Sequence, residues 1–234
     1  MAGKLKYNRV LLKISGEALS SKDSVLCREH IRKTVDDIVY MHDLGIQIGI
    51  VCGGGNILRG RSNAHMERSR ADHMGMLATA INSLALQDEI EQRGVPCRVL
   101  SSVEMPVFCD RYTSRDAKRY LDANTVVIFA CGTGSPFFST DTGASLRAAE
   151  IGADILLLAK NIDAVYSDDP KTNPNAERYT HLSYDRVIGE GLRATDLTAI
   201  TMCKEQHIPI RVFALKEIRK ILDDPSIGTT IDDA

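Results

Sequence analysis

Residues 132–141 read Gly-Thr-Gly-Ser-Pro-Phe-Phe-Ser-Thr-Asp. They follow an apolar, β-branched run at residues 125–131 that predicts a buried strand, and they precede a predicted helix at residues 142–151. A strand and a helix are usually joined by about two to six residues, so this connection is longer than a simple turn requires. Its glycines allow close backbone approach, its hydroxyls donate and accept hydrogen bonds, and its phenylalanines offer flat apolar surface. We therefore expect it to bind a polar ligand with a flat part, such as a nucleotide.

The alternation of apolar runs and amphipathic segments extends along the whole chain. Further strands are predicted at residues 9–14, 46–52, 97–100, 154–159 and 208–213. Further helices are predicted at residues 29–43, 72–93, 114–121, 183–188 and 196–206. Strands with few polar interruptions, separated by helices, indicate an α/β fold, namely an αβα sandwich with a mainly parallel central sheet. Ligands bind such sheets at the carboxyl ends of the strands, where the glycine-rich stretches of this chain lie.

Composition favours a single domain over residues 1–234, because 44% of the residues are hydrophobic and no low-complexity linker interrupts the pattern. The polar loop at residues 167–178 can separate two lobes but not two independent domains. A net charge of −2 gives no strong electrostatic reason to bind a nucleic-acid polymer or an anionic membrane. No apolar run reaches the length of a membrane span, and we expect no signal peptide.

The six cysteines are scattered, without a Cys-x-x-Cys pair. Several lie in or beside predicted strands, so we expect buried free thiols in a reducing cytoplasm rather than disulfides or a zinc site. The six histidines show no ligand spacing, and neither His-Glu-x-x-His nor Gly-x-Ser-x-Gly occurs. The sequence therefore predicts a cytoplasmic protein without metal-ligating residues of its own.

A lysine lies at the end of the first predicted strand, in the sequence Lys-Ile-Ser-Gly-Glu-Ala-Leu at residues 13–19. Ser15 and Gly16 can form a turn with outward-pointing N–H groups, and a lysine beside such a turn suits a polyphosphate. A strand-end lysine that extends to solvent beside an ordinary turn explains the same residues equally well. The segment alone leaves both interpretations open.

Three consecutive glycines follow the second strand, in Gly-Gly-Gly-Asn-Ile-Leu-Arg-Gly at residues 53–60. Such a run is unfavourable unless the backbone adopts unusual angles or approaches a ligand, and a plain turn rarely needs three glycines. Arg59 can bind a phosphate through two parallel hydrogen bonds. Residues 55–62 resemble a P-loop with arginine in the lysine position. We reject a P-loop because the planar guanidinium does not replace that lysine.

Two further segments carry carboxylates with two possible roles. Asp72 opens the long predicted helix, where its spacing favours an N-cap, although a carboxylate there can also bind ribose hydroxyls. Residues 163–170 read Asp-Ala-Val-Tyr-Ser-Asp-Asp-Pro, in which Tyr166 can stack on a base and the acidic residues can meet ribose or metal. A polar surface turn is the plainer interpretation of that second segment.

Together, these segments resemble the bacterial UMP kinases (uridylate kinases) of the amino-acid-kinase fold family, over residues 10–213. The most specific shared motifs are residues 13–19, Gly-Gly-Gly-Asn-x-x-Arg-Gly at 53–60, Asp-His-Met-Gly-Met-Leu-Ala-Thr at 72–79 and Gly-Thr-Gly-x-Pro-Phe-Phe at 132–138. The resemblance implies transfer of the γ-phosphoryl group of ATP to UMP, giving UDP and ADP, with Mg²⁺. It also implies a homohexamer inhibited by UTP. Within one amino-acid-kinase domain, it implies a UMP-binding lobe at roughly residues 1–153 and an ATP-binding lobe at roughly 154–234.

The resemblance also implies roles for individual residues. Catalysis is implied for Lys13, Arg59 and Asp141, with Asp141 orienting the lysine. ATP binding is implied for Lys13, Ile14, Ser15, Gly16, Gly55, Arg59, Tyr166, Asp169 and either Lys160 or Asn161. UMP binding is implied for Gly54, Asp72, Thr133, Gly134, Ser135, Pro136, Phe137, Phe138, Ser139 and Thr140. No general base is needed, because a phosphate oxygen with a second pKa of about 6 is mostly ionised at neutral pH.

The chain departs from the family pattern at four places. Ser135 occupies a position that is usually asparagine, and residues 160–163 read Lys-Asn-Ile-Asp instead of the common spellings. Residues 193–196 read Arg-Ala-Thr-Asp, which keeps the aspartate without the usual Val-Met before it. Residues 21–25 contain no glycine, whereas the family has a glycine-rich segment there that is tied to GTP activation. We therefore predict weak or absent activation by GTP.

Two other functions remain as alternatives. The first is a related kinase that acts on a carboxylate or carbamate, which does not need the hydroxyls and aromatic rings of residues 132–140. The second is a non-enzymatic nucleotide-binding protein, which does not need Lys13, Arg59 and Asp141 together. The sequence therefore favours phosphorylation of a nucleotide over both.

Overall fold

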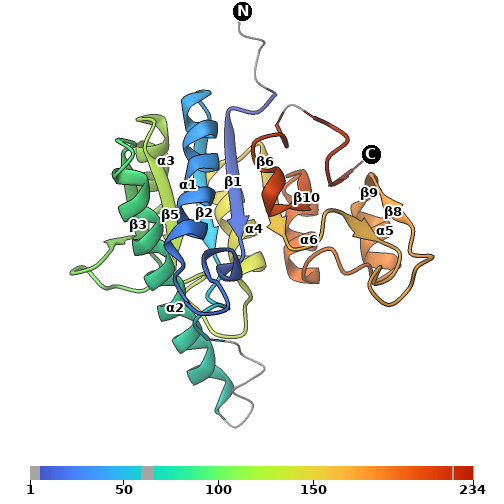
Figure 1. Cartoon of the computed structure of the whole chain (residues 1–234), viewed down its shortest axis with the longest axis horizontal. Coiled ribbons are helices and arrows are strands. Elements are labelled where there is room, and N and C mark those ends of the chain that lie inside the picture. Colours follow the sequence, from blue (N-terminus) through green and yellow to red (C-terminus); the bar gives the residue numbers. More distant parts are fainter. Residues whose placement is uncertain (1–5, 59–65, 223, 234) are drawn as a thin grey trace, which may run out of the picture.

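A sheet of nine strands runs through the computed structural model, which describes residues 6–58, 66–222 and 224–233 (Figure 1). Its strand order is β4-β3-β5-β2-β1-β6-β10-β11-β9, and only the β10–β11 pair is antiparallel. The strands of this sheet are β1 (Arg9–Ile14), β2 (Gln47–Cys52), β3 (Cys97–Ser101), β4 (Asp110–Arg111), β5 (Val126–Ala130), β6 (Ile155–Lys160), β9 (His181–Ser183), β10 (Ile210–Ala214) and β11 (Thr229–Asp232). A separate antiparallel pair consists of β7 (Val165–Tyr166) and β8 (Arg178–Tyr179).

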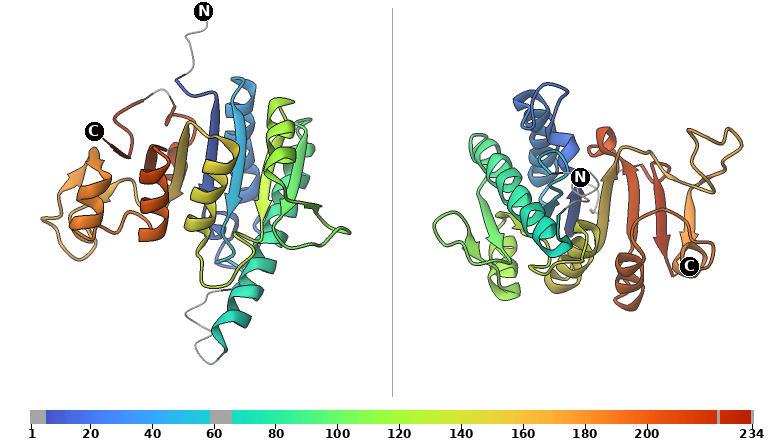
Figure 2. Two further views of the ribbon diagram at one scale, coloured as in Figure 1. Left: turned by 180° about the vertical axis from the view of Figure 1, so that it is seen from behind. Right: turned by 90° about the horizontal axis from the view of Figure 1, so that it is seen from below.

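Helices cover both faces of the sheet, as the two views of Figure 2 show. One face carries α1 (Arg28–Asp43) and α2 (Arg68–Glu91). The other carries α3 (Ser114–Asp122), α4 (Thr140–Ile151), α5 (Tyr184–Gly189) and α6 (Leu197–Glu205). Short 3₁₀ turns are η1 (Gly16–Leu19) and η3 (Leu215–Glu217). The arrangement is the αβα sandwich that the sequence predicts.

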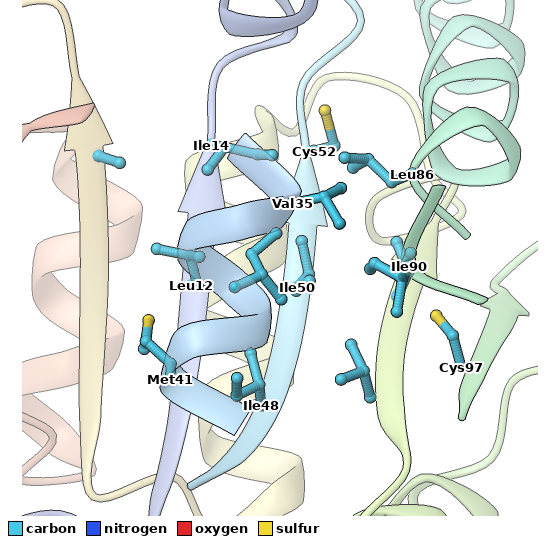
Figure 3. Close-up of a cluster of buried hydrophobic side chains, with 14 of the residues drawn as sticks. Leu12, Ile14, Val35, Met41, Ile48, Ile50, Cys52, Leu86, Ile90 and Cys97 are labelled. Carbon is cyan, nitrogen blue, oxygen red and sulfur yellow. The ribbon is translucent and has the colours of Figure 1, made fainter. Parts of the chain in front are cut away.

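Two apolar layers hold the helices to the sheet, because successive strand side chains point to opposite faces. Leu12 and Ile14 belong to the layer under α1, whereas Leu11 between them belongs to the layer under α4. Figure 3 shows the first layer, where Val35 of α1 lies over the side chains of β1 and β2. All of β1 after Arg9 is buried, which explains why its sequence lacks the polar alternation of a half-exposed strand.

The parallel strands bring the predicted site segments to one edge of the sheet. β1 lies between β2 and β6, so Lys13 near its carboxyl end lies beside Val51 and Leu158. The segments that follow β1, β2, β5 and β6 therefore emerge on the same side. The N-terminal part of α2 extends past this edge (Figure 1).

The structure corrects one predicted helix start. α2 begins at Arg68, one turn before Asp72, so the predicted role of Asp72 as an N-cap is wrong. The residue before the helix is Glu67, which makes no side-chain capping bond, so the sequence carries no start signal there. Asp72 lies within the helix, where its carboxylate is available for other contacts.

All six cysteines are free thiols, and all but Cys27 are buried, which confirms the predicted free thiols. Burial raises the pKa of Cys52 to about 12, and the nearby Lys13 charge offsets only part of that rise. This thiol at the end of β2 is therefore a packing group rather than a nucleophile. Over the described ranges, every helix is too short or too polar to pass through a lipid bilayer.

Candidate active site

Three charged residues form an ion cluster at the carboxyl edge of the sheet. The cluster consists of Lys13, Asp141 and Lys160, contributed by β1, the first turn of α4 and the end of β6. Lys13 Nζ lies 2.6 Å from Asp141 Oδ1, and Lys160 Nζ lies 3.1 Å from Asp141 Oδ2. The three side chains are between 11% and 23% exposed. The structure thus brings Lys13 and Asp141 together with Lys160, for which the sequence analysis gave only a possible contact with ATP.

The cluster keeps Asp141 ionised and leaves donors for a ligand. Burial alone would raise the pKa of the Asp141 carboxyl, but the charges of Lys13 and Lys160 and a bond from Thr195 hold that pKa well below its usual range. Two ammonium groups and one carboxylate give the cluster itself a net positive charge. Within the described residues, Lys160 donates two hydrogen bonds and Lys13 is paired with one carboxylate oxygen, so both ammonium groups keep N–H donors for an anion.

Residues 194–196, just before α6, complete the surroundings of the cluster. Lys160 Nζ donates to the Ala194 carbonyl oxygen at 2.7 Å, and Thr195 Oγ1 donates to Asp141 Oδ2 at 2.6 Å. Thr195 is a residue to which the sequence analysis gave no role. Its partner lies 54 residues earlier in the chain, so no local pattern predicts the contact.

Asp196 links the N-termini of two helices. It caps α6 by accepting the Ala199 N–H at 2.8 Å. The same carboxylate accepts the Thr142 hydroxyl at 3.0 Å and the hydroxyl of Ser139, which caps α4. The start of α4, and with it Asp141, is therefore held from outside as well as by its own cap.

The turns after β1 and β2 lie against each other without room for a side chain. A Cβ on Gly16 would lie 2.4 Å from the Gly53 carbonyl oxygen and 2.3 Å from Asn56 Oδ1, so position 16 requires glycine. Asn82 of α2 donates to the same Gly53 carbonyl at 2.7 Å and exchanges two side-chain hydrogen bonds with Asn56. These two asparagines fix the turns that follow both strands.

An open pocket of about 640 Å³ lies between α2, the glycine turn after β2 and the 132–140 loop. The predicted residues that line it are Gly54, Gly55, Asp72, Thr133, Ser135, Phe138, Ser139 and Thr140. Helix α2 adds Gly75, Met76 and Thr79. Gly54 fits closely against the helix, since a Cβ there would lie 2.8 Å from the Ala78 Cβ. Gly134, Pro136 and Phe137 belong to the same loop but do not line the pocket.

Asp72 joins the 132–140 loop to α2. Its Oδ2 accepts the Phe137 N–H at 2.8 Å and Arg68 Nε at 2.9 Å. Partial burial raises the pKa of Asp72, but these two bonds outweigh it and lower the pKa below the usual range. Phe137 and Cys131 have φ angles of 72° and 63°, which are unfavourable for residues with a side chain. The Cys131 N–H is held by Thr79 Oγ1 at 2.8 Å, so α2 supports both strained positions.

Arg147 of α4 supports the start of the 132–140 loop. This buried guanidinium donates to the Gly132 carbonyl oxygen at 3.2 Å and to the Ser102 hydroxyl at 2.8 Å. Its Cζ lies 3.9 Å from the centre of the Tyr112 ring, and it pairs with Glu150. The sequence analysis missed this residue because an arginine inside a helix carries no motif.

The residues predicted to contact ATP lie in two places. Ile14 is fully buried, so only its backbone can meet a ligand, and Ser15 Oγ accepts the Glu17 N–H at 3.4 Å. Asn161 donates to Glu17 Oε2 at 3.2 Å and makes no contact with the cluster that the structure records over its described ranges. Arg59 lies outside the described residues.

Tyr166 and Asp169 belong to the β7–β8 segment, apart from the ion cluster. The Tyr166 hydroxyl donates to Asp163 at 3.0 Å, and Asp169 accepts the Lys171 N–H at 2.9 Å in the turn that follows. Partial burial and the bond to Asp163 raise the pKa of Tyr166. In the described part of the chain, neither residue is bonded to Lys13, Asp141 or Lys160.

The described residues do not fit a resident metal ion. They contain no group of three or more His, Cys, Asp or Glu side chains that could hold one. The buried carboxylate of the site, Asp141, is already bound by two ammonium groups and a hydroxyl. A divalent ion at this edge would need ligands that a substrate brings, such as nucleotide phosphates.

Ammonium groups gathered at the carboxyl edge of a parallel sheet, beside a pocket rich in backbone and hydroxyl donors, are suited to phosphoryl transfer. A model of the amino acid kinase family matches residues 8–214, and the chain belongs to this family. Among solved structures it is similar to the UMP kinase of Bacillus anthracis, with 34% identity, 97% of this chain and 96% of that chain covered, and a TM-score of 0.93.

Two further solved structures extend the similarity. The UMP kinase of Ureaplasma parvum is 33% identical, with 98% of this chain and 100% of that chain covered and a TM-score of 0.88. The uridylate kinase of Archaeoglobus fulgidus is 26% identical, with coverages of 95% and 99% and a TM-score of 0.72. The similarity therefore extends over nearly the full length of each chain.

Proposed function

We propose that this chain is a UMP kinase, which transfers the γ-phosphoryl group of ATP to UMP and gives UDP and ADP in pyrimidine nucleotide synthesis. The observation that carries the proposal is the ion cluster of Lys13, Asp141 and Lys160, in which Asp141 directly follows, in the chain, the loop that lines the pocket. Thr140 lines the pocket, and the next residue, Asp141, holds both lysines. The similarity to two UMP kinases at 34% and 33% identity supports the same conclusion.

The chemistry requires positioning and charge neutralisation rather than a general base. The accepting phosphate of UMP has a second pKa of about 6, so its oxygen is already a nucleophile at neutral pH. Two anions must approach each other, and the remaining donors of Lys13 and Lys160 can stabilise the charge that develops between them. Asp141 keeps both ammonium groups at the reacting edge in the absence of substrate.

We assign the two substrates to different parts of the edge. UMP occupies the pocket of Gly54, Asp72 and the 132–140 loop, within a lobe of roughly residues 1–153. ATP phosphates lie against residues 13–16, Gly55 and Arg59, and Tyr166 and Asp169 line the adenine pocket in a lobe of roughly residues 154–234. Lys160 is a better phosphate contact than Asn161, since its ammonium group belongs to the ion cluster.

Mg²⁺ takes part as the MgATP substrate. Its preference for phosphate oxygens and water supports this assignment, and the described residues contain no group of three or more His, Cys, Asp or Glu side chains that could hold the ion. When bound, the ion would neutralise charge on the transferred phosphates.

The proposal is tested by one coupled assay that measures ADP formation from ATP with UMP, CMP, dUMP, acetylglutamate, glutamate or carbamate as acceptor. We expect UMP to be the preferred acceptor. ADP formation with one of the acids but not with UMP would instead identify a carboxylate or carbamate kinase. Tight ATP binding without any transfer would identify a nucleotide-binding protein.

The same assay addresses regulation. We expect inhibition by UTP, and we expect GTP to change the rate less than about twofold, since residues 21–25 lack glycine. A large, saturable rise in rate with GTP would contradict the second expectation. Free, mostly buried thiols support a location in the reducing cytoplasm.

We also propose self-association into a homohexamer. Helix α2 exposes an apolar stripe of Met74, Leu77 and Ile81, which are 40%, 56% and 46% exposed. Their spacing of three and four residues places them on one helix face. Exposed apolar residues gathered on one face are typical of an interface between protein chains.

A further inference from the structure

The Asp141 carboxylate is held at both oxygens, by two ammonium groups and one hydroxyl. Lys13 Nζ lies 2.6 Å from Oδ1, while Lys160 Nζ and Thr195 Oγ1 lie 3.1 Å and 2.6 Å from Oδ2. Two of these donors are cations that a phosphate attracts. The hydroxyl of Thr195 is neutral, so an arriving phosphate has far less tendency to draw it away from the carboxylate.

We propose that Thr195 is a positioning residue for phosphoryl transfer: its hydroxyl holds Asp141 Oδ2 so that Lys160 can turn to the phosphates while Oδ1 stays directed at Lys13. This role rests on the proposed function. Without the hydroxyl, Lys160 is the remaining recorded partner of Oδ2 within the described residues. The carboxylate then either retains Lys160 or rotates and misplaces Lys13.

The backbone on both sides of Thr195 is fixed, which suits a positioning role. The Ala194 carbonyl accepts Lys160 Nζ at 2.7 Å. On the other side, Asp196 caps α6 and binds the Ser139 and Thr142 hydroxyls. The Thr195 side chain is therefore preorganised before a substrate binds, and the hydrogen bond to Asp141 needs no ordering of a loop.

Thr195 and Asp196 act on different parts of the site, although they are adjacent. Asp196 contacts Ser139, which lines the proposed UMP pocket, and Thr142 at the start of α4, so its loss should raise the KM for UMP in addition to any effect on kcat. Thr195 contacts Asp141, which orients the lysines, and its loss should lower kcat while leaving both KM values nearly unchanged. The division between kcat and KM thus separates the two roles.

The test compares Thr195→Val, which removes the hydroxyl and nearly keeps the shape, with Thr195→Ser, which keeps the hydroxyl. We expect Thr195→Val to lower kcat about tenfold, the effect of one hydrogen bond to a charged group, with KM for ATP and UMP within about twofold of wild type. Thr195→Ser should retain most of kcat. The matched control is Thr201→Val on α6, whose exposed hydroxyl donates to the Leu197 carbonyl at 2.9 Å and should not affect turnover.

A wild-type kcat in a folded Thr195→Val protein would overturn the proposal, and so would equal losses in the valine and serine variants. A readout without turnover separates this proposal from the proposed function. In the ligand-free protein, NMR of the lysine ammonium groups, assigned with Lys160→Arg, should show an altered Lys160 signal in Thr195→Val but not in Thr201→Val. An unchanged Lys160 signal would refute the link even if UMP is the substrate. If the Lys160 signal changes in Thr195→Val but the wild-type protein forms no UDP, the link between Thr195 and Lys160 stays intact and the proposed function is overturned.

Discussion

A buried lysine is unfavourable by itself, because an ammonium group loses several kcal/mol of hydration in a protein interior. Lys13 is 9% exposed and is compensated by Asp141 at 2.6 Å. An apolar residue at the end of β1 would pack with less desolvation, and an ion pair of this kind contributes little net stability. The charge is therefore explained by what it does to a ligand rather than by folding.

Replacement of Lys13 by alanine should lower kcat by on the order of 10² or more, because one of the two ammonium groups at the reacting edge is lost. Folding should be only modestly affected, since Asp141 keeps Lys160 and Thr195 as partners. Steady-state kinetics with UMP and thermal unfolding measure both effects. Lys118→Ala, which removes an exposed lysine of α3, is the control and should behave as wild type. Near-normal turnover in a folded Lys13→Ala protein would remove Lys13 from the mechanism.

The site residues that could be predicted from sequence are those whose immediate neighbours in the chain already indicate their chemistry. Lys13 lies at the end of a strand and precedes a glycine turn, and Asp141 ends the 132–141 stretch, so both could be identified from sequence. Thr195 and Arg147 could not, because their partners Asp141 and Gly132 are brought to them by the packing of α4 against its neighbours. The predicted assignment of Arg59 stays a prediction.

At the scale of elements, α2 is fastened to α1 by charged side chains. Glu89 of α2 is 5% exposed and binds Arg93, two residues past the end of the same helix, and Arg32 of α1, the latter at 3.2 Å. Arg93 in turn lies 2.7 Å from Asp36 of α1. The bond from Arg93 lowers the pKa of Glu89 more than burial raises it, with a further contribution from Arg32.

Glu89→Gln should destabilise the protein by about 2 kcal/mol at pH 7, because two arginines lose a buried charged partner. The folded pKa of Glu89 lies below the unfolded value of about 4.3, so its contribution is complete above that pH and is lost as the pH falls through the folded pKa. Urea unfolding at pH 7 and pH 3 should therefore show a difference that shrinks in acid. Glu91→Gln on the same helix removes an exposed pair and should change stability by less than about 0.5 kcal/mol. A difference that persists unchanged at pH 3 would exclude the charge as its cause.

Long elements were predictable from sequence and short ones were not. Six strands of the central sheet have apolar runs of five or six residues, and all were predicted to within three residues. They are β1, β2, β3, β5, β6 and β10. The missed strands β4, β7, β8, β9 and β11 have two to four residues, too few for a periodic pattern. They form where neighbouring backbone offers hydrogen bonds, which is a property of the assembled sheet.

At the scale of the whole molecule, one sheet spans both proposed lobes. β1 of the first lobe pairs directly with β6 of the second, and their ends carry Lys13 and Lys160. Asp141 and Thr195 join the two lysines from the helical layer on one face. The reacting edge therefore lies on continuous secondary structure, and its geometry does not depend on closure between independent domains.

The longest helix connects this edge to the surface of the molecule. One side of α2 lines the pocket through Gly75, Met76 and Thr79, while Leu77 and Ile81 point outward. A partner chain packed on the exposed stripe would therefore hold the helix that shapes the pocket. Assembly and UMP binding should be coupled through α2.

The double variant Leu77→Glu, Ile81→Glu should convert the assembled protein to smaller species, because a charge cannot be buried at the centre of an apolar interface without a partner. Sedimentation velocity measures the mass, and UMP kinetics should show a raised KM for UMP, since α2 loses its support. Leu44→Glu, which places the same charge at an exposed apolar residue after α1, should change neither property. A wild-type mass for the double variant would exclude this stripe as the interface. Dissociation with an unchanged KM would show that the pocket is shaped within a single chain.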